Sequence, residues 1–365
     1  MLANVTGANG SGEENMVPVM EAWEKNVNED GGVAGHEVKI ELEDTKGEAS
    51  TAQAVGTRVA GDDGVVAAIS FDANAESVYA KRISESGLAV VGGVGFSPSV
   101  WGALPNWLPI ATTFPSVINA GFVMAESDGA KTTAEVVCAE VPTCKEQGGL
   151  AKNATELLDM TYGGTFAVAA ATPSYTAECL KVLDEKIDYV VLGHSAQVGL
   201  RMIKDCEKQG YSGGWAMSSN MGKKVFDEGA PESRISLALN AFPWWVDDAP
   251  VVAYRDLVQG AGIPEDMWSD IHSTAAYATL ELFKKALEAD DGLPADVDRE
   301  AVIDAYGQVK DETLDGLLPQ PITFTENEPE PLVSCYWLAA YDDKTFGDAE
   351  FTEPVCDPAE ITEKG

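Results

Sequence analysis

Short apolar strands alternate with helical stretches along this sequence, and that alternation restricts the fold more than any other feature. Val38, Ile40 and Leu42 follow the two-residue period of a strand. Apolar strands are also predicted at 64–69 and 88–91, each preceded by a helical stretch. Repeated β-α units of this kind predict a parallel sheet with helices on both faces, which is an α/β fold.

The β-α pattern starts again after an irregular stretch rich in Pro and Trp at 98–115. A chain of 365 residues is also longer than one hydrophobic core usually serves. Two more irregular stretches lie at 241–245 and 319–331. We therefore predict two doubly wound parallel-sheet lobes joined by a three-crossing hinge, with the ligand cleft between them. Residues 1–113 plus 246–320 form the predicted N-terminal lobe, and 114–245 plus 321–365 form the predicted C-terminal lobe.

The charge of the chain restricts its partners. It carries 60 acidic against 24 basic residues, a formal net charge of −36. The long-range field of such a chain opposes binding to nucleic acid and to anionic membranes. No apolar run reaches the length that spans a bilayer. The residues from Met1 onward lack the basic and apolar regions of a signal peptide, so we expect any signal segment to lie outside this sequence.

The six cysteines favour an extracytoplasmic protein. Their number is even, they form no C-x-x-C pair, and the chain has only three histidines, which argues against zinc. Reduced, buried thiols in a cytosolic protein are the alternative. Proximity in sequence favours three disulfides, although many other pairings are open: Cys138–Cys144, Cys179–Cys206 and Cys335–Cys356.

The glycine-rich turn from Thr6 to Gly12 follows a strand and precedes a helix, as a dinucleotide-binding turn does. It is one residue shorter than the short-chain dehydrogenase pattern. That pattern also needs a Tyr-x-x-x-Lys pair near mid-chain, whereas the pair here, Tyr306 and Lys310, comes late. Asp44 stands where a ribose-binding acid would. An NAD(P)-dependent oxidoreductase is therefore the alternative to a binding protein without catalysis or cofactor.

Loops at the carboxyl ends of parallel strands are where open α/β sheets bind ligands, so these loops supply the candidate ligand-binding residues. Their hydroxyls, amides and backbone N–H groups hold a solute by hydrogen bonds and need no chemistry. Helix capping explains Ser and Asn at such positions equally well, and core packing is the alternative for the aromatic residues. The candidates are Asn9, Ser70, Phe71, Asp72, Ala73, Asn74, Gly95, Phe96, Ser97, His194, Ser195, Gln197, Ser219, Asn220 and Trp244.

Several segments in order resemble the type I periplasmic binding proteins, specifically the branched-chain amino-acid (Leu/Ile/Val) receptor group. The markers are the opening turn at 5–7 and the segments 28–35, 86–91 and 187–193. The resemblance implies a solute receptor that closes by a hinge motion and delivers its ligand to the membrane permease of an ABC importer. It implies a periplasmic protein or cell-surface lipoprotein that is a monomer and not an enzyme. A ligand sensor on the same fold is the remaining alternative.

The resemblance also assigns parts of the site. Segments 72–74 and 95–97 would bind the carboxylate and ammonium of an amino acid, and Ser195 to Gln197 would replace an aromatic contact. Ser219 or Asn220 stands where amino-acid receptors carry a Glu for the ammonium. Without that Glu, Asp72 would be the anionic partner. The expected solute is amino-acid-like, an amide or an aromatic acid.

Overall fold

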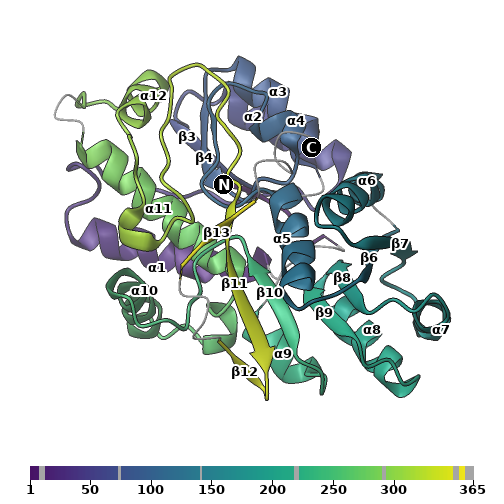
Figure 1. The fold of residues 1–365 in the computed structure, drawn as a ribbon. Helices are drawn as coiled ribbons and strands as arrows, with labels where there is room; N and C mark the ends of the chain where they lie inside the picture. The colour runs from purple at the N-terminus through teal and green to yellow at the C-terminus, as the bar shows by residue number, and fades with distance from the viewer. Residues whose placement is uncertain are drawn as a thin grey trace. The chain divides into compact units, whose positions relative to one another are not determined.

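The contacts of the chain separate it into two compact units (Figure 1). The computed structural model describes residues 1–7, 13–72, 75–139, 142–217, 222–289, 293–347 and 353–357. The first unit is Met1–Phe114 with Asn240–Val333, and the second is Pro115–Leu239 with Ser334–Gly365. The chain therefore passes from one unit to the other three times.

The unit boundaries differ from the predicted lobe boundaries at three places. Phe114 and residues 240–245 and 321–333 belong to the first unit, whereas the sequence placed them in the second. Backbone hydrogen bonds explain the difference: the Thr112 amide donates to the Asn240 carbonyl (3.1 Å), and the Thr113 amide donates to the Val333 carbonyl (3.0 Å). These bonds join Asn240 and Val333 to the end of the first stretch of chain in the first unit.

The first unit contains a parallel sheet in the order β2-β1-β3-β4-β5. Its strands are β1 (Leu2–Ala3), β2 (Glu43–Asp44), β3 (Ala67–Phe71), β4 (Ala89–Gly93) and β5 (Trp107–Leu108). Its helices are α1 (Met16–Glu29), α2 (Ala49–Gly61), α3 (Glu76–Glu85), α4 (Pro98–Trp101), α10 (Ala249–Gly260), α11 (Ile271–Ala289) and α12 (Arg299–Gly307), with short 3-10 turns at Glu13–Asn15, Glu265–Met267 and Leu314–Gly316.

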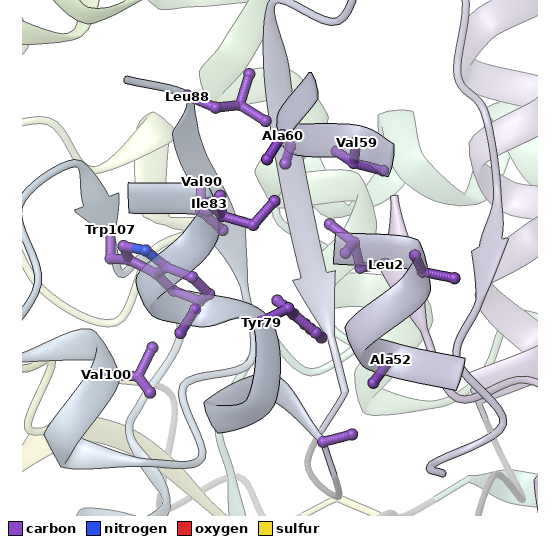
Figure 2. Close-up of a cluster of buried hydrophobic side chains, with 14 of the residues drawn as sticks. Leu2, Ala52, Val59, Ala60, Tyr79, Ile83, Leu88, Val90, Val100 and Trp107 are labelled. Carbon is purple, nitrogen blue, oxygen red and sulfur yellow. The ribbon is translucent and has the colours of Figure 1, made fainter. Parts of the chain in front are cut away.

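The helices of the first unit cover both faces of its sheet. Figure 2 shows the apolar cluster on one face, where Ala52 and Val59 of α2 and Ile83 of α3 pack with Leu2 and Val90. Successive residues of a strand point to opposite faces, so Val91 faces the other side from Val90. Helix α11 covers that second face, where it contacts β4. The layers match the predicted α/β architecture of this unit.

The second unit contains a sheet in the order β12-β11-β10-β9-β8-β6-β7. Strands β6 to β10 pair in parallel, and β11 pairs antiparallel with β10, β12 and β13. The strands are β6 (Thr132–Cys138), β7 (Thr161–Val168), β8 (Tyr189–Gly193), β9 (Gly214–Met217), β10 (Ile235–Leu239), β11 (Cys335–Asp342), β12 (Thr345–Phe346) and β13 (Val355–Cys356). The helices are α5 (Phe114–Ser127), α6 (Pro142–Leu157), α7 (Thr176–Asp184), α8 (Ala196–Lys208) and α9 (Lys223–Gly229).

All three predicted disulfides are present, and all lie in the second unit. Cys138–Cys144 joins the end of β6 to the first turns of α6. Cys179–Cys206 joins α7 to α8, and Cys335–Cys356 joins the paired strands β11 and β13. None of the described residues forms a helix long and apolar enough to cross a membrane.

Arg299 donates hydrogen bonds to backbone carbonyls at several helix and strand ends of the first unit. The Arg299 guanidinium donates to the carbonyls of Ala60 (3.2 Å) and Asp62 (2.5 Å), which end α2. It also donates to the carbonyl of Ser86 (3.0 Å) after α3 and to that of Val65 (3.0 Å) before β3. The cation thus lies at the negative ends of two helix dipoles.

We expect Arg299→Met to destabilise the first unit by about 2–3 kcal/mol, because it leaves these carbonyls without a charged donor while keeping most of the apolar stem. Chemical denaturation of the variant measures the change. Arg234→Met is a matched control in the second unit, where Arg234 donates to the Ser236 hydroxyl (3.1 Å). Equal stability losses in the two variants would contradict the special role of Arg299.

Candidate functional site

The carboxyl ends of β1 to β4 lie at one edge of the first-unit sheet, because these strands run parallel. Asp44 ends β2, Asp72 follows β3, and the loop Gly95 to Ser97 follows β4. This edge carries most of the candidate residues predicted in the first lobe. Asn9, Ala73 and Asn74 lie outside the described residues.

The side chains at the end of β3 make contacts within the first unit. The Asp72 carboxylate accepts the amide of Ala75, the residue before α3, at 3.0 Å. The Ser70 hydroxyl lies 2.8 Å from the Tyr79 hydroxyl, and the Phe71 ring meets the His272 ring edge-on at 6.3 Å. All three predicted residues are buried. A role for them in ligand binding stays a prediction.

Glu76, which sequence reasoning missed, holds the loop after β4 in place. Its carboxylate accepts the Ser97 amide at 2.6 Å and the Trp101 indole N–H at 2.8 Å. Burial raises the pKa of Glu76 to about 8, against the lowering effect of those two bonds. A glutamate in the first turn of a helix is ordinary in sequence, so no local signal marked it. The bond to Glu76 therefore holds the backbone of the loop from Gly95 to Ser97 at Ser97. Phe96, the middle residue of this loop, is half-buried.

A second buried glutamate lies at the same edge. Glu13 accepts the amide of Asn4, just after β1, at 2.8 Å. Burial raises the pKa of Glu13 well above its ordinary value, and the charge of Asp72 raises it further. The charge of Asp72 acts in the same direction on Glu76. Glu13, Asp72 and Glu76 thus form a group whose charges act on one another, here termed the first-unit carboxyls.

In the second unit the predicted residues follow β8. The His194 Nδ1 accepts the Ser195 amide at 2.7 Å, so Nδ1 carries no proton. Ser195 precedes the first residue of α8, and the Gln197 side chain is exposed. The disulfide Cys138–Cys144 closes the connection after the neighbouring strand β6. Ser219 and Asn220 follow β9 and lie outside the described residues.

Trp244 belongs to the first unit, not to the second as the sequence predicted. Its ring meets that of Trp245 edge-on at 4.7 Å. The Arg255 guanidinium donates to the carbonyls of Trp244 (3.1 Å) and Val246 (2.5 Å), which holds this turn against α10. The side chain is 4% exposed, which is typical of a packing residue. Its predicted ligand contact stays untested.

The residues that suggested a dinucleotide enzyme have other contacts. The Asp44 carboxylate accepts the amides of Val5 and Lys46, both at 3.0 Å, so it stabilises the first turn. The Lys310 ammonium donates to the Phe324 carbonyl at 2.7 Å. Among the described residues, no group of His, Cys, Asp and Glu is arranged to hold a metal ion.

Two α/β units linked by three chain passages, the first with a parallel sheet and the second with a mainly parallel one, define the class of type I solute-binding proteins. A family model described as periplasmic binding protein matches residues 1–345, and the chain belongs to that family. The fold is the type I fold of that family, as the sequence predicted. A search of curated protein sequences finds no match.

Solved structures resemble the chain along its whole length. A branched-chain amino acid ABC transporter protein from Thermus thermophilus with bound valine is 14% identical, with a TM-score of 0.84, and the match covers 99% of this chain and 96% of that one. The substrate-binding protein LivJ from Streptococcus pneumoniae, in complex with isoleucine, is 13% identical (TM-score 0.77, 98% of each chain). A fatty acid ABC transporter substrate-binding protein from Thermomonospora curvata is 16% identical (TM-score 0.78, 100% and 92%).

Proposed function

We propose that this chain is the extracytoplasmic solute-binding component of an ABC importer. The observation that carries the proposal is the match of the periplasmic binding protein family along residues 1–345. The similarity in fold to receptors for valine, isoleucine and fatty acids supports it. The protein would bind a small solute without catalysis, close on it, and present the closed form to the permease subunits. The disulfides suit a compartment outside the cytoplasm.

The first-unit carboxyls bear on the class of solute. Asp72 is buried, and its charge acts on both Glu13 and Glu76. A solute carboxylate placed near Asp72 would meet like charge, whereas an ammonium or an amide N–H would find an acceptor. An amino-acid-like or amide solute is therefore favoured over an aromatic or fatty acid. Asp72 would take the role that a second-lobe Glu has in the receptors that the sequence resembles.

A thermal-shift panel tests both parts of the proposal. We expect leucine or leucinamide to raise the melting temperature by a few °C, because a solute at a hundred times its Kd stabilises the folded state by about 2.7 kcal/mol. Isocaproate, which has the leucine skeleton without nitrogen, and phenylacetate should raise it less. Asp72→Asn should weaken the binding of the nitrogen-bearing solute roughly ten- to hundredfold, since it removes one charge-assisted hydrogen bond.

The control for Asp72→Asn is Asp63→Asn, which removes the same charge from an exposed position. Asn at position 72 keeps an oxygen for the Ala75 amide, so the fold should survive. Equal binding by both variants, or stronger stabilisation by isocaproate, would contradict the solute class. Stabilisation by NAD alone would favour the oxidoreductase alternative instead.

A further inference from the structure

Four polar side chains lie together inside the second unit, contributed by α5, β11 and the segment after β13 (these elements are labelled in Figure 1). Ser116 and Asn119 lie one turn apart on α5, Tyr336 is the second residue of β11, and Asp357 follows β13. All four are buried, and the most exposed of them, Asp357, is 8% exposed. We name this group the Asp357 site. None of its members is among the candidate ligand-binding residues.

The backbone that carries Asp357 is held firmly against β11. Strand β13 pairs antiparallel with the start of β11, and the disulfide Cys335–Cys356 joins the two strands. The Asp357 amide donates to the Ser334 carbonyl at 3.0 Å. On the side-chain end, Asn119 Nδ2 donates to Asp357 Oδ2 at 3.1 Å. The Asp357 carboxyl is therefore fixed in place, in contact with α5.

The hydrogen bonds of the Asp357 site leave three oxygen atoms without a partner. These are Asn119 Oδ1, Asp357 Oδ1 and the Tyr336 hydroxyl, all of them buried. Burial raises the pKa of Tyr336, and the nearby charge of Asp357 raises it further, although the two side chains are not placed for a hydrogen bond. Nearly all buried polar atoms in native proteins are satisfied, by ordered water or an ion where protein groups do not reach. Three such oxygens from three parts of the chain indicate a bound species.

The charge of the Asp357 site restricts what that species is. Burial raises the pKa of Asp357 to about 6, so the carboxyl is ionised at pH 8. The described side chains that lower this pKa are those of Asn119, Ser116 and Tyr336, and none of them is cationic. A buried carboxylate without a positive partner is strongly destabilised. A water molecule would satisfy the three oxygens but leave the charge uncompensated, whereas a cation does both.

The ligand atoms and their single charge favour a monovalent metal ion. Carboxylate, amide and hydroxyl oxygens are hard ligands, which suit the alkali and alkaline-earth ions better than transition metals. Asp357 supplies one negative charge, so a divalent ion would leave a positive charge unbalanced in the interior. In the described part of the chain, no group of three or more His, Cys, Asp and Glu side chains is placed to hold a metal, which agrees with a site of low charge.

We propose that Asn119, Tyr336 and Asp357 bind one monovalent metal cation inside the second unit. The cation joins α5 to β11 and to the segment that β13 carries. Helix α5 and strand β11 begin at the two points where the chain enters the second unit. The bound cation therefore fastens these two entry points to each other from within the second unit, and its loss should loosen that connection.

Thermal unfolding at pH 8 in about 200 mM NaCl, compared with the same concentration of choline chloride, tests the proposal. Both salts screen the acidic surface equally, but choline is too large for a buried site. We expect Na⁺ to raise the melting temperature of the second unit by about 3 °C over choline. Asp357→Asn should abolish this difference, and Tyr336→Phe, which removes one of the three oxygens, should reduce it by roughly half.

The same comparison at pH 5 provides a second readout. Asp357 then holds a proton, because its pKa is about 6, so Na⁺ and choline should give equal melting temperatures. Tyr336, the other titratable group of the site, stays protonated at both pH values, since its pKa is raised. A preference for Na⁺ that is as large at pH 5 as at pH 8 would contradict binding at Asp357.

The matched control is Asp343→Asn, which removes the same charge from an exposed position of the second unit and should keep the full preference for Na⁺. In choline chloride at pH 8, Asp357→Asn should melt no lower than the parent, because it removes an uncompensated charge. A purely structural role of Asp357 would instead lower the melting temperature in both salts. Equal melting of the parent in the two salts, or equal loss of the preference in both variants, would overturn the proposal.

A crystal soaked in a thallium(I) salt locates the ion directly, because this monovalent cation scatters anomalously. We expect an anomalous peak beside Asn119 Oδ1, Asp357 Oδ1 and the Tyr336 hydroxyl. Density for water alone at that position would show that the site holds no cation and would overturn the proposal. No solute takes part in any of these measurements, so their outcome is separate from that of the solute-binding panel.

Discussion

Raising the pH from about 5 to about 8 is expected to lower the free energy of unfolding by several kcal/mol, because two buried carboxyls bind protons far more tightly in the folded state than in the unfolded state. Burial raises the pKa of both Glu76 and Glu135 to about 8, from an ordinary value of 4.5. Between these values the folded protein holds more protons than the unfolded chain. Stability is therefore highest below the unfolded pKa and falls as the pH rises toward the folded pKa.

The contribution of Glu135 to this pH dependence is easier to assign than that of Glu76. Glu135 lies in the middle of β6, between Thr165 of β7 and Val191 of β8, and is 0% exposed. Neither carboxyl oxygen has a hydrogen-bond partner. One pKa unit corresponds to about 1.4 kcal/mol, so the shift on this residue is worth at most about 3–4 kcal/mol over the window. Asp270 and Asp357, whose pKa values burial raises to about 6, act in the same direction at lower pH.

Urea denaturation at a series of pH values measures the slope of the free energy of unfolding against pH. The free energy of unfolding of Glu135→Gln should equal that of the parent near pH 5, where Glu135 is protonated in the folded state. Near pH 8 it should be larger than that of the parent. The control Glu185→Gln changes an exposed residue of the same unit and should leave the slope as it is. A parent that is more stable near pH 8 than near pH 5 would contradict the prediction, as would identical slopes for the two variants.

Loss of the three disulfides is expected to unfold the second unit while the first remains folded. The bridged residues are 6, 27 and 21 positions apart. Chain entropy assigns about 2 kcal/mol to the shortest loop and about 3–4 kcal/mol to each of the longer two. Their sum, roughly 9 kcal/mol, is comparable to the whole stability of a typical domain. The first unit has no cysteine and should not respond.

Hydrogen exchange of the reduced protein, read by mass spectrometry, distinguishes the two units. Amides of β8 should lose most of their protection in reductant, whereas those of β4 should keep theirs. The double variant Cys179→Ala/Cys206→Ala should show a smaller loss in the same direction. If β4 and β8 lose protection together, the two units unfold as one and the assignment of the disulfide energy to the second unit is wrong.

The sequence predicted those features of the fold that depend on local pattern. The strands predicted at 64–69 and 88–91 are observed as β3 (Ala67–Phe71) and β4 (Ala89–Gly93). Proximity in sequence also paired all six cysteines correctly. These features depend on side-chain period and on short separations along the chain, which a single sequence displays directly.

Features that depend on distant partners could not be predicted. Glu76 contacts Ser97 and Trp101 across 21 and 25 positions, and Arg299 reaches carbonyls more than two hundred positions away. No local pattern distinguishes these residues from the many charged residues on the surface. The predicted unit boundaries differ from the observed ones for the same reason. The hydrogen bonds that place Asn240 and Val333 in the first unit join segments remote in sequence.

The division of each unit into separate stretches of chain sets the order in which the protein can form during synthesis. The sheet of the first unit is complete after β5, but α11, which covers one of its faces, is made only at residues 271–289. The second unit needs β11 and β13, which come later still. One face of the first-unit sheet and the β11 side of the second-unit sheet thus remain uncovered or unpaired until late in synthesis. Completion of either unit has to wait for these late segments.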